Sequence, residues 1–458
     1  MSKKPKNKIL IIFNANFLSS WLNFDIINTL GKYSDIEIAL PQNLHTIHKI
    51  QLTKWKTHIV SWPHDTVLIK MVFFIKQIKF RKSSISINSR LKRLIFGDLR
   101  VTMKFGWKFY LFSLTLNFYK MIKFAIRNPF RVMLYIPIIA SLMEFFLRLM
   151  VFYNKRTLDL FQENFDLIII PSSAHELDAY KQILYARNCG IKSLVAIENW
   201  DNLSSKAVFP ILPDFTTVIG KTSVEYAISI HGLQQNCIFP IGIPRFEHYR
   251  NQSFRNLDKS MIRTKTRIEV IYLGFSLAHD ELRLLSDLNV NLAQICPDIN
   301  FNITHRKHPF AQPRYNYVDG RVTLDTTQTS DSREMLNKSL PQINSEYLSQ
   351  LSKYDLVIST PTSMAIECML LNLPLIIDGT DDGLHRTSAG KSLKNYLHLT
   401  DLMTIEGLSI AKDVKNLAEL CRDFTTNPED FTDFDLNKIV NISKLSYGEQ
   451  LADALELR

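Results

Sequence analysis

Cysteine is scarce in this chain and is scattered along it. Five cysteines occur among 458 residues, and no two of them form a C-x-x-C pair. Such spacing provides neither a zinc framework nor a disulfide pattern, and it is typical of a protein that works in the reducing cytoplasm. The five are Cys189, Cys237, Cys296, Cys368 and Cys421.

Long hydrophobic runs are also missing. The longest charge-free run in the most apolar region covers residues 132–143, which is shorter than the roughly 18 to 20 residues that a membrane-spanning helix needs. Near the start of the sequence, Asn14 and Asn16 interrupt an apolar run that superficially resembles a signal peptide. We expect a first β-strand that enters a loop there instead.

Acidic residues are nearly absent from one part of the chain, residues 70–156. This segment holds 18 Lys and Arg residues against Asp98 and Glu144, so it contains all of the excess positive charge in a chain of net charge +11. Its many aromatic and aliphatic residues favour an anionic membrane surface as its partner. We interpret residues 66–156 as a basic, amphipathic, membrane-associating insertion. An insertion packed on the first domain and a true membrane span are the alternatives, and no recognisable nucleic-acid motif accompanies the charge.

The rest of the chain alternates short apolar runs with helical patterns. Continuous apolar strands between helices predict parallel sheets that are covered on both faces. The length of the chain, with 46% apolar and 22% charged residues, exceeds what one hydrophobic core usually supports. We therefore predict an α/β protein with two doubly wound, Rossmann-like domains. The expected strands cover residues 8–13, 35–40, 166–171, 192–197, 216–220, 237–242, 268–275, 301–309, 355–360 and 374–378.

The domain boundaries follow from the same pattern. We expect an N-terminal domain in residues 1–245, which includes the insertion, and a polar linker in residues 246–265. A second domain then covers residues 266–425, and helices of residues 426–458 are expected to pack back on the first domain.

Polar side chains follow the predicted strands at the edge where ligands of such sheets bind. Ser359, Thr360, Thr362 and Ser363 come directly after one strand, and Glu367 follows on the next helix. Hydroxyls and free N–H groups at a helix N-terminus favour an anion, so this pattern predicts a phosphate cradle with a carboxylate that accepts from a ribose diol or an amine. Simple capping of the helix by Ser359 or Thr362 is the alternative.

Four segments carry a resemblance to known enzymes. LVISTPTSMAIECMLLNLPLII (356–377) resembles the nucleotide-binding segment of two-domain GT-B glycosyltransferases. HRKHP (305–309) resembles the His-Pro motif of enzymes that use cytidine nucleotides, namely CDP-glycerol glycerophosphotransferases, capsule Kdo transferases and bacterial sialyltransferases. PIGIPRFEHY (240–249) resembles the end of their first domain, and NWDNLSSK (199–206) is similar to a loop of related proteins of bacterial surface-carbohydrate biosynthesis.

The resemblance implies a GT-B enzyme whose two domains face a cleft and which needs no metal or other cofactor. It assigns the donor nucleotide to His308, Pro309, Ser359, Thr360, Thr362, Ser363 and Glu367. A base that takes the acceptor proton is expected on the loops of the first domain, with four candidates: Asp201, Asp178, His175 and Glu176. Other residues expected to face the cleft are Asn199, Trp200, Asn202, Ser204, Lys206, His385 and Arg386.

The expected function is transfer of a sugar or polyol phosphate from a nucleotide donor to a polysaccharide or lipid-linked acceptor. The donor is expected to be a CMP-sugar or CDP-polyol, with a UDP-sugar as the other possibility. The work would take place on the cytoplasmic face of the membrane, in surface-polysaccharide biosynthesis. A sugar-nucleotide 2-epimerase and a non-catalytic scaffold of a glycan assembly complex are the alternatives.

Overall fold

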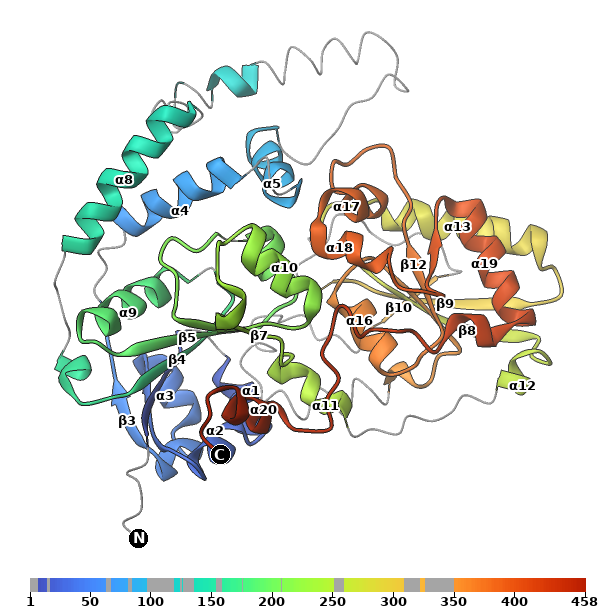
Figure 1. Ribbon diagram of the computed structural model, residues 1–458. Helices are drawn as coiled ribbons and strands as arrows, with labels where there is room; N and C mark the ends of the chain where they lie inside the picture. Colours follow the sequence, from blue (N-terminus) through green and yellow to red (C-terminus); the bar gives the residue numbers. More distant parts are fainter. Residues whose placement is uncertain are drawn as a thin grey trace. The chain divides into compact units, whose positions relative to one another are not determined.

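The computed structural model describes residues 7–14, 17–62, 67–80, 85–96, 119–123, 126, 136–153, 159–174, 176–206, 208–250, 259–308, 322–325 and 350–458. Contacts divide the chain into two compact units (Figure 1). The first unit consists of Met1–Asn88, Asn128–Arg250 and Asn437–Arg458, and the second of Ser89–Arg127 and Asn251–Leu436.

The first unit is built on a parallel sheet, in which seven described strands have the order β3-β2-β1-β4-β5-β6-β7. Side chains of β1 alternate between two cores, because Ile9 and Ile11 pack on one side of the sheet while Leu10 and Ile12 pack on the other. Both faces are therefore buried, as the uninterrupted apolar runs predict. The strands are β1 Lys8–Ile12, β2 Asp35–Leu40, β3 Lys56–Ile59, β4 Leu167–Ser172, β5 Lys192–Ile197, β6 Phe215–Thr217 and β7 Ile238–Phe239.

Helices lie between these strands and cover the sheet. The described α-helices of the first unit are α1 Leu18–Asn23, α2 Ile26–Gly31, α3 Gln42–His48, α4 Val67–Phe80, α8 Pro137–Tyr153, α9 Leu177–Asn188, α10 Lys221–Ser229, α11 Glu247–Arg250 and α20 Tyr447–Ala454. Helix α5 (Ile85–Phe96) crosses the boundary between the two units.

The last helix belongs to the core of the first unit. Ser446 and Glu449 form a capping box that begins α20, and this helix packs against α2. Tyr447 is buried, with its ring 6.1 Å from that of Trp21 and its hydroxyl 2.9 Å from that of Thr217. The chain thus returns to the first unit after it has completed the second.

The second unit repeats the design with a parallel sheet whose described strands have the order β10-β9-β8-β11-β12-β13. Helices α13 and α19 pack together on one face, where Leu285, Leu288, Leu417 and Phe424 share a core (Figure 1). The strands are β8 Arg267–Leu273, β9 Asn300–Arg306, β10 Val322–Leu324, β11 Leu356–Ser359, β12 Leu375–Asp378 and β13 Ser409–Ala411. The helices are α12 Lys259–Ile262, α13 Glu281–Ile295, α16 Ser363–Leu370, α17 Ala389–Asn395, α18 Leu397–Leu402 and α19 Val414–Thr426.

Two parallel α/β sheets confirm the predicted fold class. The sequence patterns missed three short strands, β3, β10 and β13, which lie at sheet edges. An edge strand is paired on one side only, and β3 is largely open to solvent, so these strands lack the apolar run that reveals a central strand.

Helices α4 and α8 represent the described part of the basic insertion in the first unit. They pack through Val72, Ile75 and Ile78 on one side and Ala140 on the other. Lys79 of α4 also donates to the carboxylate of Glu144 on α8 across 2.6 Å. No helix in the part of the chain that the structure describes is both long and apolar enough to cross a membrane.

Candidate functional site

The parallel strands of the second unit end at one edge of the sheet, and most of the predicted donor residues follow these ends. Residues 307–308 follow β9, residues 360–363 follow β11, whose last residue is Ser359, and residues 379–382 follow β12. This is the edge at which open α/β sheets bind ligands. Pro309, a predicted member of the set, lies outside the described residues.

The hydroxyls of Ser359 and Thr360, at the end of β11, both donate hydrogen bonds within the protein. Ser359 Oγ donates to the carbonyl of Thr360 at 2.8 Å, and Thr360 Oγ1 donates to the carbonyl of Leu273 on β8 at 3.0 Å. Both side chains are fully buried. Neither hydroxyl proton is therefore available to a phosphate in this arrangement, and the two residues fix the end of β11 against β8.

Thr362 differs from both neighbours. It occupies the N-cap of α16 in an extended conformation, but its side chain makes no capping hydrogen bond. Its Oγ1 is buried, and it has no hydrogen-bond partner among the described residues. Burial of a hydroxyl without a hydrogen-bond partner costs about 1–3 kcal/mol, because its lost hydrogen bonds to water are not replaced. The side chain of Thr362 therefore does not cap the helix. Its hydroxyl, which has no partner among the described residues, is a position at which a ligand atom can bind.

Ser363 and Glu367 continue the same helix. Ser363 is the first residue of α16, and Glu367 lies one turn further on with its side chain 5% exposed. The N–H groups of this first turn point out of the helix, and they favour an anion there. Glu367 would then face the part of a ligand that lies deeper in the site.

His308 follows the end of β9 close to the end of β8. Burial lowers the pKa of His308 below its usual value of 6.5, so its ring is neutral at pH 7 and can donate one hydrogen bond. Gly274 allows this approach of the two strand ends, since a Cβ there would lie 3.1 Å from both the His308 nitrogen and the Arg306 carbonyl oxygen.

A buried network of acids and bases, which the sequence patterns missed, lies beside these strand ends. Tyr272 donates to Asp378 Oδ2 at 2.7 Å, and His279 Nε2 lies 3.1 Å from the same oxygen. His279 Nδ1 lies 3.5 Å from Asp382 Oδ2. Burial opposes the charge on His279, but Asp378 and Asp382 outweigh it and raise the pKa of His279 to about 10.

Asp382 organises the loop after β12. Its carboxylate accepts from the backbone N–H groups of Asp280, Leu384 and His385 at 2.8–3.0 Å. Burial alone would raise the pKa of Asp382, but the bonds from His279, His385 and the backbone hold it well below its usual value. The network thus locks the β12 loop onto the start of α13.

Two predicted cleft residues belong to this loop. His385 is buried, and its Nδ1 lies 2.6 Å from Asp382, so this side of its ring is occupied by the network. The guanidinium of Arg386 lies 5.5 Å from the centre of the Phe96 ring. Both positions support the loop, and contact with a donor stays a prediction for each.

The candidate bases of the first unit have different surroundings. The Glu176 carboxylate accepts from Ser172 Oγ at 2.6 Å and from the Ser173 backbone at 2.9 Å, so it ties the end of β4 to the start of α9. Asp178 lies in the first turn of α9. His175 lies outside the described residues.

The NWDNLSSK loop forms one turn of π-helix, Asn202–Lys206. The backbone carbonyl of Asp201 accepts from Ser205 Oγ at 2.8 Å and from Ser204 Oγ at 3.3 Å. Trp200, Asn202 and Ser204 are buried, and both amide atoms of Asn202 are without a partner among the described residues. Asn199 precedes the turn, and the side chain of Lys206 lies outside the description.

Glu198, at the end of β5, is a candidate that the sequence patterns passed over. It is buried, and it accepts from Trp21 Nε1 at 2.7 Å. Burial, with a further contribution from the charge of Glu176, raises the pKa of Glu198 to about 8. The signal was present in the sequence, because Glu198 follows an apolar run in the same way as the hydroxyl turn does.

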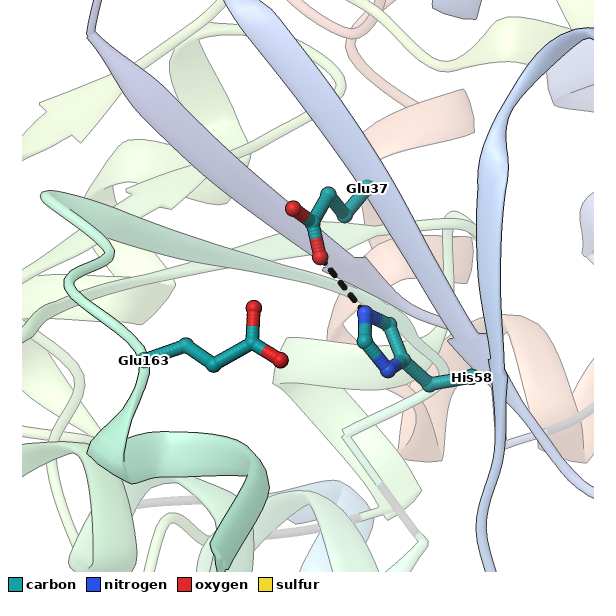
Figure 2. Close-up of side chains that lie close together, drawn as sticks. All are labelled: Glu37, His58 and Glu163. Carbon is teal, nitrogen blue, oxygen red and sulfur yellow. Dashed lines mark hydrogen bonds and ion pairs between the residues drawn. The ribbon is translucent and has the colours of Figure 1, made fainter.

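One cluster in the first unit has the residue types of a metal site. Figure 2 shows Glu37, His58 and Glu163 turned toward one another, with His58 Nε2 2.5 Å from Glu37. Lys8 and Lys56 each lie within 3.1 Å of both carboxylates. Burial would raise the pKa of Glu37, but bonds from His58, Lys8 and Lys56 lower it to about 2. The two ammonium groups balance the two carboxylates, so the cluster is a closed ion-pair network.

Comparison with known proteins gives no family. No family model matches the sequence, and no curated protein matches it. Among solved structures, UDP-GlcNAc 2-epimerase from Methanocaldococcus jannaschii is 12% identical, with 98% of this chain and 100% of that chain covered and a TM-score of 0.49. The S. aureus MnaA–UDP structure is 8% identical, covers 99% and 98%, and has a TM-score of 0.44. The lipopolysaccharide outer core galactosyltransferase WaaB is 10% identical, covers 98% and 99%, and has a TM-score of 0.45.

Proposed function

We propose that the chain is a GT-B transferase that moves a sugar or polyol phosphate from a nucleotide donor to a growing surface glycan. The second unit would bind the donor nucleotide, and the first unit would supply the acceptor side. We further propose a cytidine nucleotide as the donor's leaving group, because of the His-Pro pair at 308–309. The enzyme would work at the cytoplasmic face of a membrane.

The observation that carries this proposal is the unsatisfied hydroxyl of Thr362. It lies at the N-terminus of α16, at the ligand-binding edge of a parallel sheet. A phosphate oxygen there would accept from Thr362 Oγ1 and from the first N–H groups of α16, which satisfies all of these donors at once. Helix N–H groups can also neutralise the departing phosphate, so the proposed reaction needs no bound metal.

The remaining donor contacts follow from position. His308, neutral because of burial, would donate to a second phosphate oxygen. Glu367 would accept from a ribose hydroxyl or an exocyclic amine. Ser359 and Thr360 would position the turn that leads to Thr362, since their hydroxyl protons and the Thr360 N–H are already donated within the protein.

For the proton of the acceptor hydroxyl, we propose Asp201 or Asp178 as the base. Glu176 already accepts three hydrogen bonds from Ser172 and Ser173, so its carboxylate oxygens are occupied by the turn that it holds. Glu198 is protonated at neutral pH, given its pKa of about 8, so it suits donation of a proton or a hydrogen bond better than abstraction.

A membrane role is proposed from the outer face of α8. Ile138, Leu142 and Phe146 follow one another at steps of four residues, so they share a helix face, and their side chains are 55–73% exposed. Large exposed apolar residues in a strongly basic segment are typical of helices that lie in the membrane interface. Such contact would bring the enzyme to a lipid-linked acceptor.

The test is isothermal titration of the full chain with CMP, CDP, UDP and GDP. We expect selective binding of cytidine nucleotides, with loss of binding in His308→Ala and in Glu367→Ala. Glu406→Ala is the matched control, because Glu406 is an exposed carboxylate of the second unit, and it should bind as the unaltered chain does.

Other outcomes would redirect the proposal. Selective binding of UDP or GDP would keep a nucleotide-dependent transferase and remove the cytidine assignment. Inversion of a sugar carbon without any acceptor would indicate an epimerase. Binding of none of the four nucleotides would overturn the transferase proposal in favour of a scaffold.

A further inference from the structure

The first unit contains a cavity. It has a volume of about 540 Å³, which is within the ~300–1,000 Å³ of ordinary small-molecule sites. Residues of helices α4, α8 and α9 and of the loop 210–212 line it, and we call it the α4–α8–α9 groove. Its apolar lining includes Ile69, Val72, Phe145, Leu149, Leu184 and Ile211.

The charged residues in the described lining of the groove are both positive. Lys76 and Arg187 line it, and no carboxylate is found among its described lining residues. Lys76 is 4% exposed, with its ammonium 2.6 Å from the Phe209 carbonyl. Arg187 lies at the solvent side and donates to the Leu212 carbonyl at 2.6 Å. A site with positive charge at its solvent side and an apolar interior suits a molecule that has both an anionic group and a hydrocarbon chain.

The groove is continuous with the exposed apolar surface of α8. Phe145 lines the groove although its side chain is 58% exposed, and its ring packs edge-to-face on that of Phe146 at 5.8 Å. Phe145 thus belongs both to the groove lining and to the exposed surface of α8.

We infer that the α4–α8–α9 groove binds the hydrocarbon chain of a phosphate-bearing lipid, whose phosphate pairs with Arg187. This inference rests on the proposed function in one respect, because it identifies the lipid-linked acceptor of that reaction as the occupant. The apolar side walls take the chain, and the planar guanidinium of Arg187 offers N–H donors to the phosphate.

The test uses dodecyl phosphate below its micelle concentration as the probe, titrated into the full chain. We expect saturable binding that weakens about tenfold or more in Phe145→Ser, since one aromatic wall of the site is lost. Phe146→Ser is the matched control: the same residue type, the next position of α8 and 60% exposed, but outside the groove lining. Its affinity for the probe should be unchanged.

The charge is tested separately. Dodecanol, which has the same chain without phosphate, should bind more weakly than dodecyl phosphate, and Arg187→Gln should abolish that difference while Arg187→Lys restores part of it. Inorganic phosphate alone should not bind measurably, because the chain supplies most of the contact area.

Three results would overturn the inference: no saturable binding of dodecyl phosphate, equal losses in Phe145→Ser and Phe146→Ser, or equal binding of dodecanol. The second result would mean adsorption to the outer face of α8 rather than occupation of the groove. Nucleotide titration of the same preparations keeps the two proposals apart. Loss of probe binding with intact nucleotide binding rejects the groove alone, whereas intact probe binding without nucleotide binding rejects the transferase alone.

Discussion

Lys79 of α4 and Glu144 of α8 form a 2.6 Å ion pair that turns Glu144 toward the neighbouring helix. Glu144 is one of two acids in residues 70–156, and its side chain is only 8% exposed. The inward turn directs the carboxylate away from solvent, while Ile138, Leu142 and Phe146 of the same helix are exposed. The same contact therefore joins two helices and removes a charge that anionic lipid would repel.

Replacement of Glu144 should loosen this helix pair. In Glu144→Gln we expect a loss of about 1–2 kcal/mol in the free energy of unfolding, because a charge-assisted bond becomes a neutral one while its partner stays half-exposed. Urea unfolding measures the change. Lys70→Gln removes an exposed charge from the same helix α4 and should shift stability by less than about 0.5 kcal/mol; equal shifts in the two variants would contradict the role of the pair.

Vesicle binding should depend on the outer face of α8. Ile138→Ser is expected to weaken binding to anionic vesicles about tenfold or more, because an isoleucine that enters the interface contributes roughly 1.5–3 kcal/mol of burial. Ile50→Ser is the control, since Ile50 is also an exposed isoleucine of the first unit, 87% against 73% exposed. A loss in both variants, or in neither, would speak against α8 as the membrane contact.

Thr362 and Thr360 should respond in opposite ways to the same change. Thr362→Val removes a buried hydroxyl that has no partner among the described residues, so the ligand-free protein should become about 1 kcal/mol more stable while nucleotide affinity falls about tenfold. Thr360→Val removes a bond to the Leu273 carbonyl, and this variant should lose about 1 kcal/mol of stability. Thermal unfolding with and without nucleotide separates the two; unchanged affinity in Thr362→Val would remove Thr362 from the site.

The charge of His279 should make the second unit sensitive to alkaline pH. The folded-state pKa of about 10 lies above the ordinary value of 6.5, so the folded state holds a proton that the unfolded chain has released. Its stabilisation is complete below pH 6.5 and is lost as the pH rises toward 10, with a slope of at most about 1.4 kcal/mol per pH unit. Urea unfolding from pH 6 to 10 should show this decline, and it should be absent in His279→Gln.

Glu198 should produce a decline in a lower pH window. Its folded pKa of about 8 lies above the ordinary 4.5, so the folded state keeps the carboxyl protonated while the unfolded chain ionises. Stability should therefore fall as the pH rises from about 4.5 to 8. Glu198→Gln mimics the protonated form and can still accept from Trp21, so it should be more stable than the unaltered chain at pH 7.5 and nearly equal at pH 4.5. A variant that is less stable at both pH values would show that Glu198 is charged in the fold.

The sequence could predict those parts of the fold that depend on local pattern. The central strands β1, β4, β5, β8 and β11 are visible because both faces of each are buried, which produces an uninterrupted apolar run. The edge strands and the network around Asp378 were not visible. Tyr272 lies within an apolar strand, and His279 lies in a loop, so nothing local indicates that both meet the last residue of β12.

The candidate site could be predicted to a similar extent. The hydroxyl turn after β11 was found from its position, but which hydroxyls remain available was not. That depends on the carbonyl of Leu273, which is far away in the sequence and adjacent in the sheet. Asp382 could not be recognised as part of the site, because its contacts come from the N-cap of α13 and from the backbone around it.

The position of α20 bears on how the chain is made. Tyr447 closes the core around Trp21, yet it leaves the ribosome after all the strands of both sheets. The second unit can fold while synthesis continues, whereas the first must wait with its Trp21 surface uncovered until the last helix emerges. The unit whose strands are synthesised first thus completes its core last. Until then, a chaperone can bind the apolar surface around Trp21.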